Sequence, residues 1–283
     1  MGKVRSVNAG LVSIIVTTKN SERTLRACLS SARGQTYPDV EIIVVDNDST
    51  DDTMRIAREF ADSVVQGGPE RSAQRNIGIR EARGAWVLVL DSDMVLDPDV
   101  VAESVAAAKQ CNAAGVVVPE FSFGEGFWGA CKILERSFYT NDGIVTAARF
   151  FDRETVVSLG GYDESLTGPE DWDMSIRVCG SPATVFAQTR ILHDEGRHSL
   201  GSLFVRKFYY GRSMPRFIRK HGASALCRLN PFRGALLRNF FHIFKNPVLG
   251  CGLVVIKMVE STGGFLGMLD GRVRSSDAVY RKA

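Results

Sequence analysis

Short apolar segments alternate with amphipathic segments along the first 110 residues of the chain. Residues 11–18 (LVSIIVTT) are apolar, rich in β-branched side chains and followed by polar residues, a pattern typical of a buried strand. Residues 22–33 instead repeat apolar side chains every three to four positions, which predicts an amphipathic helix that Ser21 can cap. The alternation continues, with strands predicted at 41–45, 63–66 and 86–90 and helices predicted at 51–60, 71–83 and from 97 onward.

These predicted strands are apolar on both faces. Such strands, when helices separate them, form a mostly parallel sheet that is covered on both sides, so the sequence predicts an α/β, Rossmann-like fold with flanking helices. No G-x-G-x-x-G follows the first predicted strand, and no G-x-x-x-x-G-K-[ST] occurs anywhere in the chain. These absences argue against a dehydrogenase and against a P-loop nucleotidase.

The middle and the end of the chain have other patterns. Strands are predicted at 116–119, 144–151 and 184–186, with a helix at 127–138. From residue 199 the chain becomes a series of basic helices rich in aromatic side chains and interrupted by proline and glycine. We therefore expect a catalytic domain over 1–198 and a C-terminal helical region over 199–283.

Charge is distributed unevenly along the chain. The net charge is only +3, yet no Asp or Glu occurs between Gly196 and Val259, where twelve Lys and Arg residues accumulate. Aromatic residues are interleaved with these cations in 203–217 and 236–244, a composition suited to an anionic membrane surface. A helical cap that packs on the catalytic domain is the alternative, and nothing else in the sequence supports binding to nucleic acid.

Residues 248–269 form an apolar run that is almost long enough to cross a bilayer. Because Lys257, Glu260 and several glycines interrupt the run, we predict a segment that lies on the membrane surface or re-enters it. Together with the basic helices, this predicts peripheral membrane contact through 199–269.

The cysteines and the N-terminus bear on location. The six cysteines are scattered, without a C-x-x-C pair or zinc spacing, which is typical of reduced thiols in the cytosol. The apolar run at 11–16 is short and soon becomes polar, so no secretory signal is predicted. We expect a cytoplasmic protein at the cytoplasmic face of the membrane.

Carboxylates follow two of the predicted strands. Asp46 follows the second strand, and Asp91 and Asp93 follow the fourth. Ligands bind at the carboxyl ends of parallel strands, and two carboxylates spaced as D-x-D suit a hard cation such as Mg²⁺ or Mn²⁺. The alternative is that Asp91 and Asp93 only shape the turn before Asp97.

Four ordered motifs give this site a more specific interpretation. They are residues 14–20 (IIVTTKN), 43–51 (IVVDNDSTD), 91–93 (DSD) and 170–173 (EDWD). With this spacing the chain resembles the family 2 glycosyltransferases of the GT-A fold, over about residues 11–192. The resemblance implies an inverting enzyme that takes its sugar from a UDP- or GDP-sugar with the help of Mn²⁺ or Mg²⁺.

The resemblance also implies roles for individual residues. The base and ribose of the donor would contact Thr17, Lys19, Asn20, Asp46 and Asp48. The diphosphate and the ribose near the metal would contact Arg71, Arg75, Asp91 and Ser92. The metal ligands would be Asp91, Asp93 and His193. For Arg71 and Arg75, which are four positions apart at a helix start, the alternative is a solvated helix face with Glu70 as partner.

Asp171 matches the general base of the family, which removes a proton from the acceptor hydroxyl as the new C–O bond forms. The alternative is that Pro169, Glu170 and Asp171 only begin a helix, and both interpretations are compatible. The Q-x-x-R-W motif of the polymer synthases does not follow Asp171, so we expect one sugar to be transferred per encounter.

The predicted activity is transfer to a hydroxyl acceptor on a lipid-linked or cell-surface glycan precursor. Glycosylation of a polyprenyl phosphate is an alternative within the same class. A nucleotidyltransferase and an inactive sugar-nucleotide-binding protein are the alternatives from other classes. The first should have a Gly-rich basic loop after the first strand, and residues 17–20 are not one.

Overall fold

The computed structural model of the protein describes residues 8–139, 142–229 and 246–280. Its first part comprises β1 (Asn8–Thr18), α1 (Glu22–Arg33), β2 (Val40–Asp46), α2 (Thr53–Phe60), β3 (Ser63–Gln66), α3 (Arg71–Glu81) and β4 (Gly84–Asp91). Its middle part comprises β5 (Met94–Leu96), α4 (Val100–Cys111), β6 (Gly115–Val116), β7 (Glu120–Glu125), α5 (Gly126–Ser137), β8 (Phe150–Asp152), α6 (Arg153–Ser158), α7 (Glu170–Cys179) and β9 (Ile191–Arg197). Its last part comprises α8 (Leu200–Gly211), α9 (Met214–His221), α10 (Ala223–Leu229) and α13 (Pro247–Tyr280).

Six strands form the main sheet, in the order β3-β2-β1-β4-β8-β6. The four strands β1 to β4 run parallel, and β8 is antiparallel to both of its neighbours. The register pairs Thr18 with Asp46 and Thr17 with Asp91, so the carboxyl ends of β1, β2 and β4 lie at one edge of the sheet. The predicted mostly parallel α/β fold is confirmed, and the strand-end carboxylates lie together as expected.

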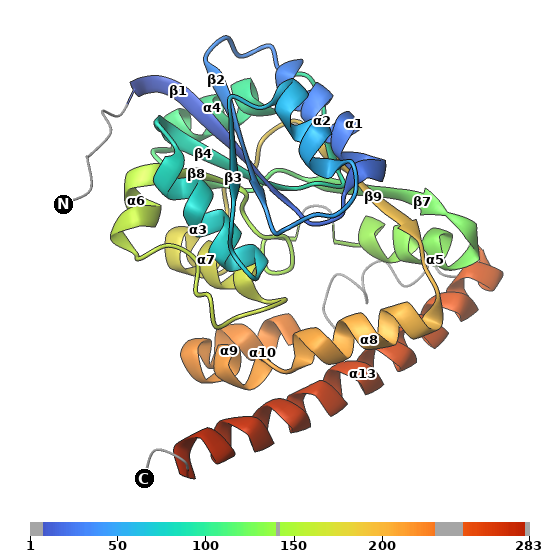
Figure 1. Ribbon diagram of the computed structural model, residues 1–283. Helices are drawn as coiled ribbons and strands as arrows, with labels where there is room; N and C mark the ends of the chain where they lie inside the picture. The colour runs from blue at the N-terminus through green and yellow to red at the C-terminus, as the bar shows by residue number, and fades with distance from the viewer. Residues whose placement is uncertain (1–7, 140–141, 230–245, 281–283) are drawn as a thin grey trace.

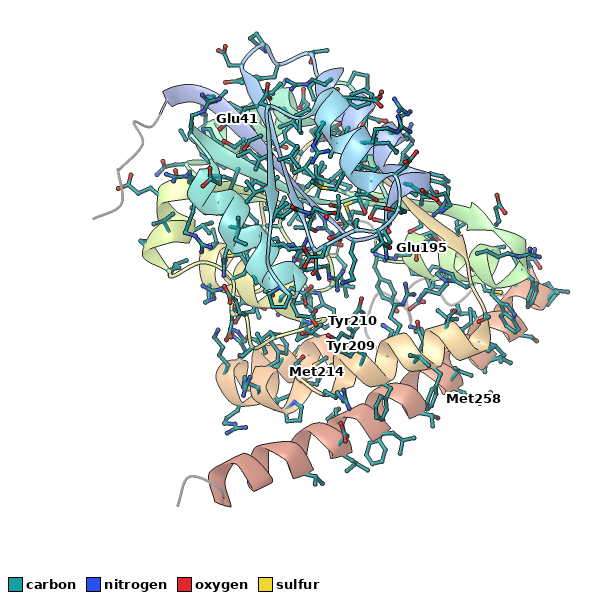
Figure 2. All side chains as sticks on the ribbon, viewed as in Figure 1. Glu41, Glu195, Tyr209, Tyr210, Met214 and Met258 are labelled. Carbon is teal, nitrogen blue, oxygen red and sulfur yellow. The ribbon has the colours of Figure 1, made fainter. Side chains whose placement is uncertain are left out.

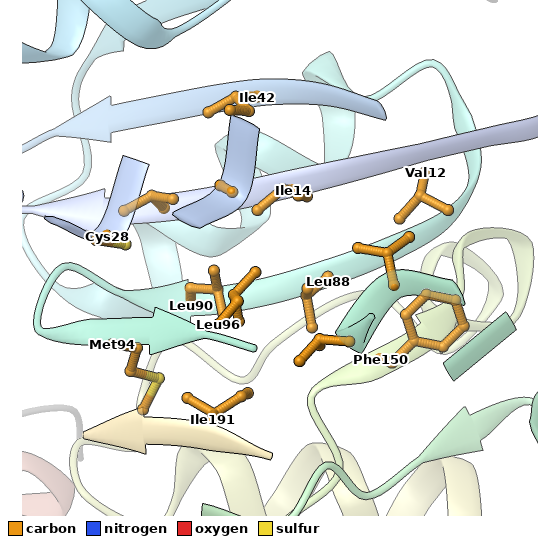
Figure 3. Packing of buried hydrophobic residues seen from close by; sticks show 14 of the residues in the cluster. Val12, Ile14, Cys28, Ile42, Leu88, Leu90, Met94, Leu96, Phe150 and Ile191 are labelled. Atoms are coloured by element: carbon orange, nitrogen blue, oxygen red, sulfur yellow. The ribbon is translucent and has the colours of Figure 1, made fainter. Parts of the chain in front are cut away.

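Both faces of the main sheet are buried. Successive side chains of a strand point to opposite faces, and each set belongs to its own buried cluster. Ile14 belongs to a cluster with Leu88 and with Cys28 of α1, which Figure 3 shows at close range. The next residue, Ile15, belongs to a second cluster that includes Met174 of α7. Each such apolar side chain contributes about 1.5–3 kcal/mol when it leaves water, so the two clusters hold the helices on the sheet.

Several predicted boundaries can now be compared with the structure. The helix at 22–33 and the strand at 63–66 are confirmed to the residue. The helix predicted at 71–83 is wrong at its end, because α3 stops at Glu81 and Gly84 already belongs to β4. The strand predicted at 144–151 is shortened to β8, and 184–186 contributes only an isolated bridge between Phe186 and Val117.

A second, three-stranded sheet with the order β5-β9-β7 is absent from the sequence prediction. Here His193 of β9 pairs with Met94 of β5 on one side and with Ser122 of β7 on the other. β5 has only three residues, and β7 and β9 mix apolar with charged residues, so none of the three forms the continuous apolar run that predicts a buried strand. This sheet brings Glu120 and His193 beside the turn that carries Asp93.

The C-terminal helices lie below the main sheet in the view of Figure 1, with α13 along the outer edge of the molecule. Helix α8 begins at a capping box between Ser199 and Ser202, so the boundary predicted between 198 and 199 falls in the connection from β9 to α8. The basic segment predicted at 236–244 lies outside the described residues.

The glycines that interrupt the apolar run of 248–269 do not interrupt the helix, because α13 is continuous. Gly263, Gly267 and Gly271 are four residues apart and face α8. A Cβ atom on Gly267 would stand 2.0 Å from the carbonyl oxygen of Phe208, so only glycine allows this backbone approach. In the part of the chain that the structure describes, Pro247–Val273 is the one helix whose length and composition would let it cross a membrane.

Candidate active site

A cavity of about 560 Å³ lies where β1 and β4 end. The end of β1 contributes Thr17 to its wall, the turns after β1 and β4 contribute Lys19 and Asp93, and α7 contributes Asp171. Helices α5, α8 and α13 contribute further residues, among them Tyr210, which Figure 2 shows on the side of α8 that faces the sheet domain. The cavity therefore joins the predicted catalytic domain to the C-terminal helices.

Asp93 and His193 lie next to each other in this cavity. The Nε2 atom of His193 is 3.3 Å from Oδ2 of Asp93, and its Nδ1 atom is 3.6 Å from Glu120. Burial by itself would lower the pKa of His193, but the two carboxylates outweigh burial and raise it to about 10. The Oδ1 atom of Asp93 is buried and has no hydrogen-bond partner in the part of the chain that the structure describes.

This pair suits a divalent cation that takes its other ligands from water and a diphosphate. Asp93 offers a free carboxylate oxygen, and His193 offers a ring nitrogen once it loses its proton. Among the described residues no three His, Cys, Asp or Glu side chains form a group that could hold a metal by themselves. The predicted trio is incomplete in this conformation because Asp91 faces two arginines instead.

Arg75 connects Asp91 to Asp171. Its Nη1 atom donates to Asp171 Oδ1 at 2.5 Å, and its Nη2 atom donates to Asp91 Oδ1 at 2.9 Å. The guanidinium also lies 5.1 Å from the centre of the Tyr162 ring and is 0% exposed. Because Arg75 is fully buried, it presents no surface to a diphosphate in this conformation, contrary to the prediction. It instead holds the carboxylates of Asp91 and Asp171 in place.

Glu170 precedes Asp171 in the first turn of α7, so the expectation of a helix start is confirmed. Arg71 Nη2 is 3.2 Å from Glu170 and also donates to the Tyr210 hydroxyl at 2.9 Å. Arg71 pairs with Glu170 and the buried Arg75 pairs with two aspartates, so the alternative of a solvated helix face with Glu70 as partner is wrong. Glu70 instead accepts a hydrogen bond from Tyr209. Burial raises the pKa of Glu170, although the arginines oppose this shift.

Arg149 is a site residue that the sequence did not reveal. Its Nε atom donates to Glu120, and its other nitrogens lie 3.6 Å from Asp91 and 3.8 Å from Asp171. The Nη1 atom is buried at the cavity wall, and no described residue forms a hydrogen bond with it. An isolated Arg outside any recognisable motif carries no sequence signal, but here it offers a cation to an anionic ligand.

The predicted contacts with the base and ribose divide into two groups. Thr17, Lys19 and Ser92 line the cavity as expected. Asp46 is fully buried and accepts hydrogen bonds from the hydroxyl of Thr18 and from Ser49, so in this conformation it presents no surface to a base.

Asn20 and Asp48 are exposed and do not line the cavity. Both adopt left-handed backbone, with φ of 47° and 48°, in adjoining turns. The side chain of Asn20 accepts a hydrogen bond from the backbone of Thr50. These residues therefore shape the loops beside the cavity, and their predicted contacts with the donor stay predictions.

Residues 13–160 match the family model described as glycosyl transferase family 2, which is more than half of the chain. The chain belongs to glycosyl transferase family 2. This glycosyltransferase is 31% identical over 195 residues to a PGL/p-HBAD biosynthesis glycosyltransferase of Mycobacterium tuberculosis, and the match covers 65% of this chain and 75% of the relative. It is also 28% identical over 247 residues to a chondroitin synthase of Escherichia coli, covering 79% of this chain and 35% of that protein.

Solved structures share the GT-A fold of this glycosyltransferase. The TarS protein of S. aureus, residues 1–349 in complex with UDP-GlcNAc, superposes with a TM-score of 0.57 at 16% identity, over 96% of this chain and 92% of that one. The glycosyltransferase spans 44% of a longer TarS chain. A mannosyltransferase of Pyrobaculum calidifontis in complex with GDP-Man and Mn²⁺ superposes with a TM-score of 0.54 at 18% identity, over 97% and 82% of the two chains.

The family decides between the classes of function left open by the sequence. The chain is a nucleotide-sugar-dependent glycosyltransferase, and the two relatives are named for PGL/p-HBAD biosynthesis and for chondroitin synthesis. The nucleotidyltransferase and the inactive binding protein are thereby set aside.

Proposed function

We propose that this glycosyltransferase moves a sugar, with inversion, from a UDP- or GDP-sugar to a hydroxyl of a lipid-linked or cell-surface glycan precursor. The supporting observation is that Asp171 and the Asp93–His193 pair line one cavity, which extends from the strand ends to the C-terminal helices. The solved neighbours were bound to UDP-GlcNAc and to GDP-Man, which supports a donor of either type.

In the proposed reaction the acceptor hydroxyl attacks the anomeric carbon of the sugar. Asp171 takes the hydroxyl proton as the new C–O bond forms, and the bond from the sugar to the diphosphate breaks on the opposite face. The nucleoside diphosphate leaves with the bonding electrons, and Arg149, Arg71 and Lys19 supply cations for its growing charge. A bound Mg²⁺ or Mn²⁺, held by Asp93 and His193, would add positive charge beside the diphosphate.

Arg75 has a positioning role in this scheme. Because it bonds both Asp171 and Asp91, it fixes the base relative to the turn that carries Asp93. A base must lie within hydrogen-bond reach of the hydroxyl that it deprotonates, so a fixed carboxylate lowers the cost of reaching that geometry.

The test is hydrolysis of a panel of UDP- and GDP-sugars with Mn²⁺. Asp171→Asn should lower the rate about 10²- to 10⁴-fold while the affinity for the donor persists, because a general base acts on the chemical step. Asp93→Ala should remove metal-dependent donor binding. Asp39→Asn, which changes an exposed carboxylate away from the cavity, is the matched control. A full rate in Asp171→Asn would refute the role of this base.

We also propose peripheral contact with the cytoplasmic face of a membrane, through the helices of 199–269. The outward side of α13 carries an apolar stripe at helical spacing, made of Val254, Met258, Phe265, Leu269 and Val273. Exposed cations on α9, among them Arg216 and Arg219, suit anionic headgroups. A glycosyltransferase placed in this way meets a lipid-linked acceptor at the membrane surface.

A further inference from the structure

Five charged side chains meet where α5, α8 and α13 converge. They are Lys132 and Glu135 of α5, Lys207 of α8, and Lys257 and Glu260 of α13. Lys132 Nζ is 2.5 Å from Glu135 and 3.0 Å from Glu260, and Lys257 also pairs with Glu135. We call these five residues the interhelix cluster.

The interhelix cluster carries more positive than negative charge. Three lysines face two glutamates, which leaves one positive charge in excess if all five are ionised. Lys207 is the least well paired, since its closest carboxylate oxygen, on Glu260, is 4.0 Å away. Its neighbour Arg206 also lines the cavity and forms no ion pair with any described residue. A partly buried site with surplus cations is favourable for an anion.

The pKa of Lys207 agrees with this charge balance. Burial lowers it to about 8, and the attraction of Glu260 opposes burial without cancelling it. The side chain of Lys207 is 38% exposed, and it forms part of the cavity wall. A lysine in this state gains more from an added anion than one that is already paired.

The interhelix cluster shares its cavity with the catalytic residues but is separate from them. Lys132, Glu135, Lys207 and Lys257 all line the same cavity as Asp93 and Asp171. The strand-end side of the cavity has ion pairs of its own: Arg149 contacts Asp91 and Glu120, and Arg136 contacts Glu120 and Glu195. Because the interhelix cluster comes from α5, α8 and α13 and not from the strand ends, we assign an anion bound there to a second ligand rather than to the donor diphosphate.

We propose that Lys207, Lys257 and Arg206 form a subsite for a phosphate group of the acceptor. The inference rests on the proposed glycosyl transfer, in which the hydroxyl beside Asp171 belongs to this second ligand. Lysine and arginine bind phosphate through charge-assisted hydrogen bonds. The phosphate has two possible sources, a lipid headgroup and a water-soluble phosphorylated glycan, and both present the same chemistry.

Calorimetric titration of the full chain with geranyl phosphate tests the subsite. We expect wild type to bind geranyl phosphate and Lys207→Met to bind it about tenfold more weakly, a change of about 1.4 kcal/mol. Lys207→Arg should retain the affinity because the charge remains. Lys109→Met, on the exposed side of α4, is the matched control and should bind like wild type. If the melting temperature shows that Lys207→Met does not fold, Arg206→Gln takes its place.

Three results would overturn the subsite. They are no binding of geranyl phosphate by wild type, equal binding by Lys207→Met, and equally tight binding of geraniol, which lacks the phosphate. Titration with inorganic phosphate separates the sources: similar affinity supports a soluble phosphate, and much weaker affinity supports a lipid headgroup. UDP-sugar binding measured on the same samples tests the proposed function separately, since donor binding without geranyl phosphate binding overturns the subsite alone.

Discussion

Arg75 contacts carboxylates that come from distant parts of the chain. Asp91 is 16 positions away and Asp171 is 96 positions away, and Glu170 lies 3.6 Å from the same guanidinium. The three acids would repel one another without this cation, because they share a poorly solvated space. The charge of one arginine thus permits the proposed general base, a strand-end carboxylate and a buried glutamate to lie together.

Replacement of Arg75 by Met should destabilise the protein strongly. Removal of one partner from a buried ion pair leaves uncompensated charge and costs about 3–5 kcal/mol. Urea denaturation monitored by circular dichroism measures the change in the free energy of unfolding. Arg55→Met removes an exposed arginine that also pairs with two acids, and it should leave stability unchanged within error. Equal losses in the two variants would contradict the role assigned to burial.

The stability of the protein should depend on pH through Lys207. Its pKa is about 8 in the folded protein and 10.5 ordinarily, so the unfolded chain binds more protons between these values. The free energy of unfolding therefore rises as pH increases from about 8 to 10.5, because the folded protein no longer buries a charged Lys207. Below about pH 8 the destabilisation by buried, charged Lys207 is constant. The difference in the free energy of unfolding between wild type and Lys207→Met, measured by urea denaturation, should rise over that interval. Lys109→Met is the control, and a difference that stays flat would contradict the prediction.

At the scale of elements, two glycine positions of α13 have different surroundings. Gly267 lies against the backbone of α8, whereas a Cβ on Gly264 would meet no atom within 4 Å. The same substitution in the same helix therefore separates close packing from helix propensity. The stripe of Gly263, Gly267 and Gly271 defines how α13 rests on α8.

Gly267→Ala should lower the melting temperature, because overpacking costs about 1–3 kcal/mol. Gly264→Ala should leave the melting temperature the same or raise it, since alanine is favoured over glycine in helices by about 1 kcal/mol. Thermal denaturation of the two variants beside wild type gives the answer. A lower melting temperature in Gly264→Ala alone would show that the packing face is assigned incorrectly.

The sequence predicted those elements whose apolar residues form a continuous run or repeat at helical spacing. The central strands of the main sheet are continuous apolar runs, and the helix of Leu25 and Cys28 has one apolar stripe, so local pattern suffices. The sheet of β5, β9 and β7 was not predicted. Its polar residues Glu120 and His193 face the cavity, and the cavity is formed only by the whole fold.

The candidate site shows the same division. The position of Asp91 at a strand end follows from the length of an apolar run, and Asp171 follows from a family motif. The burial of Asp46 and Arg75 does not follow from either, because it depends on partners such as Ser49 and Asp171 in the folded chain. Arg149 and the interhelix cluster likewise come together only through tertiary contacts.

At the scale of the whole molecule, α13 carries the apolar stripe on one side and contributes to the cavity wall on another. Lys257 lines the cavity, while its neighbours Val254 and Met258 are more than half exposed on the outer side. Figure 2 labels Met258 on α13, at the margin of the molecule away from the sheet domain. A membrane bound at this stripe would lie against the same helix that closes the proposed acceptor subsite.

Replacement of Met258 and Phe265 by Asp should weaken binding to vesicles of phosphatidylcholine and phosphatidylserine. Each lost side chain forgoes about 1.5–3 kcal/mol of burial, or about tenfold or more in partitioning. Flotation in a density gradient measures the bound fraction. The matched control is Val157→Asp with Leu159→Asp, which changes exposed apolar residues at and just after α6. Unaltered flotation of the α13 variant would refute the proposed membrane face.

The cavity wall combines residues made early and late in synthesis. Thr17 and Lys19 leave the ribosome long before Lys257, and yet all three line one space. A nascent chain can therefore assemble its strand-end carboxylates while the far wall does not yet exist. Because α13 contributes Lys257 to that wall, the proposed acceptor subsite is complete only after this helix has been made and has docked.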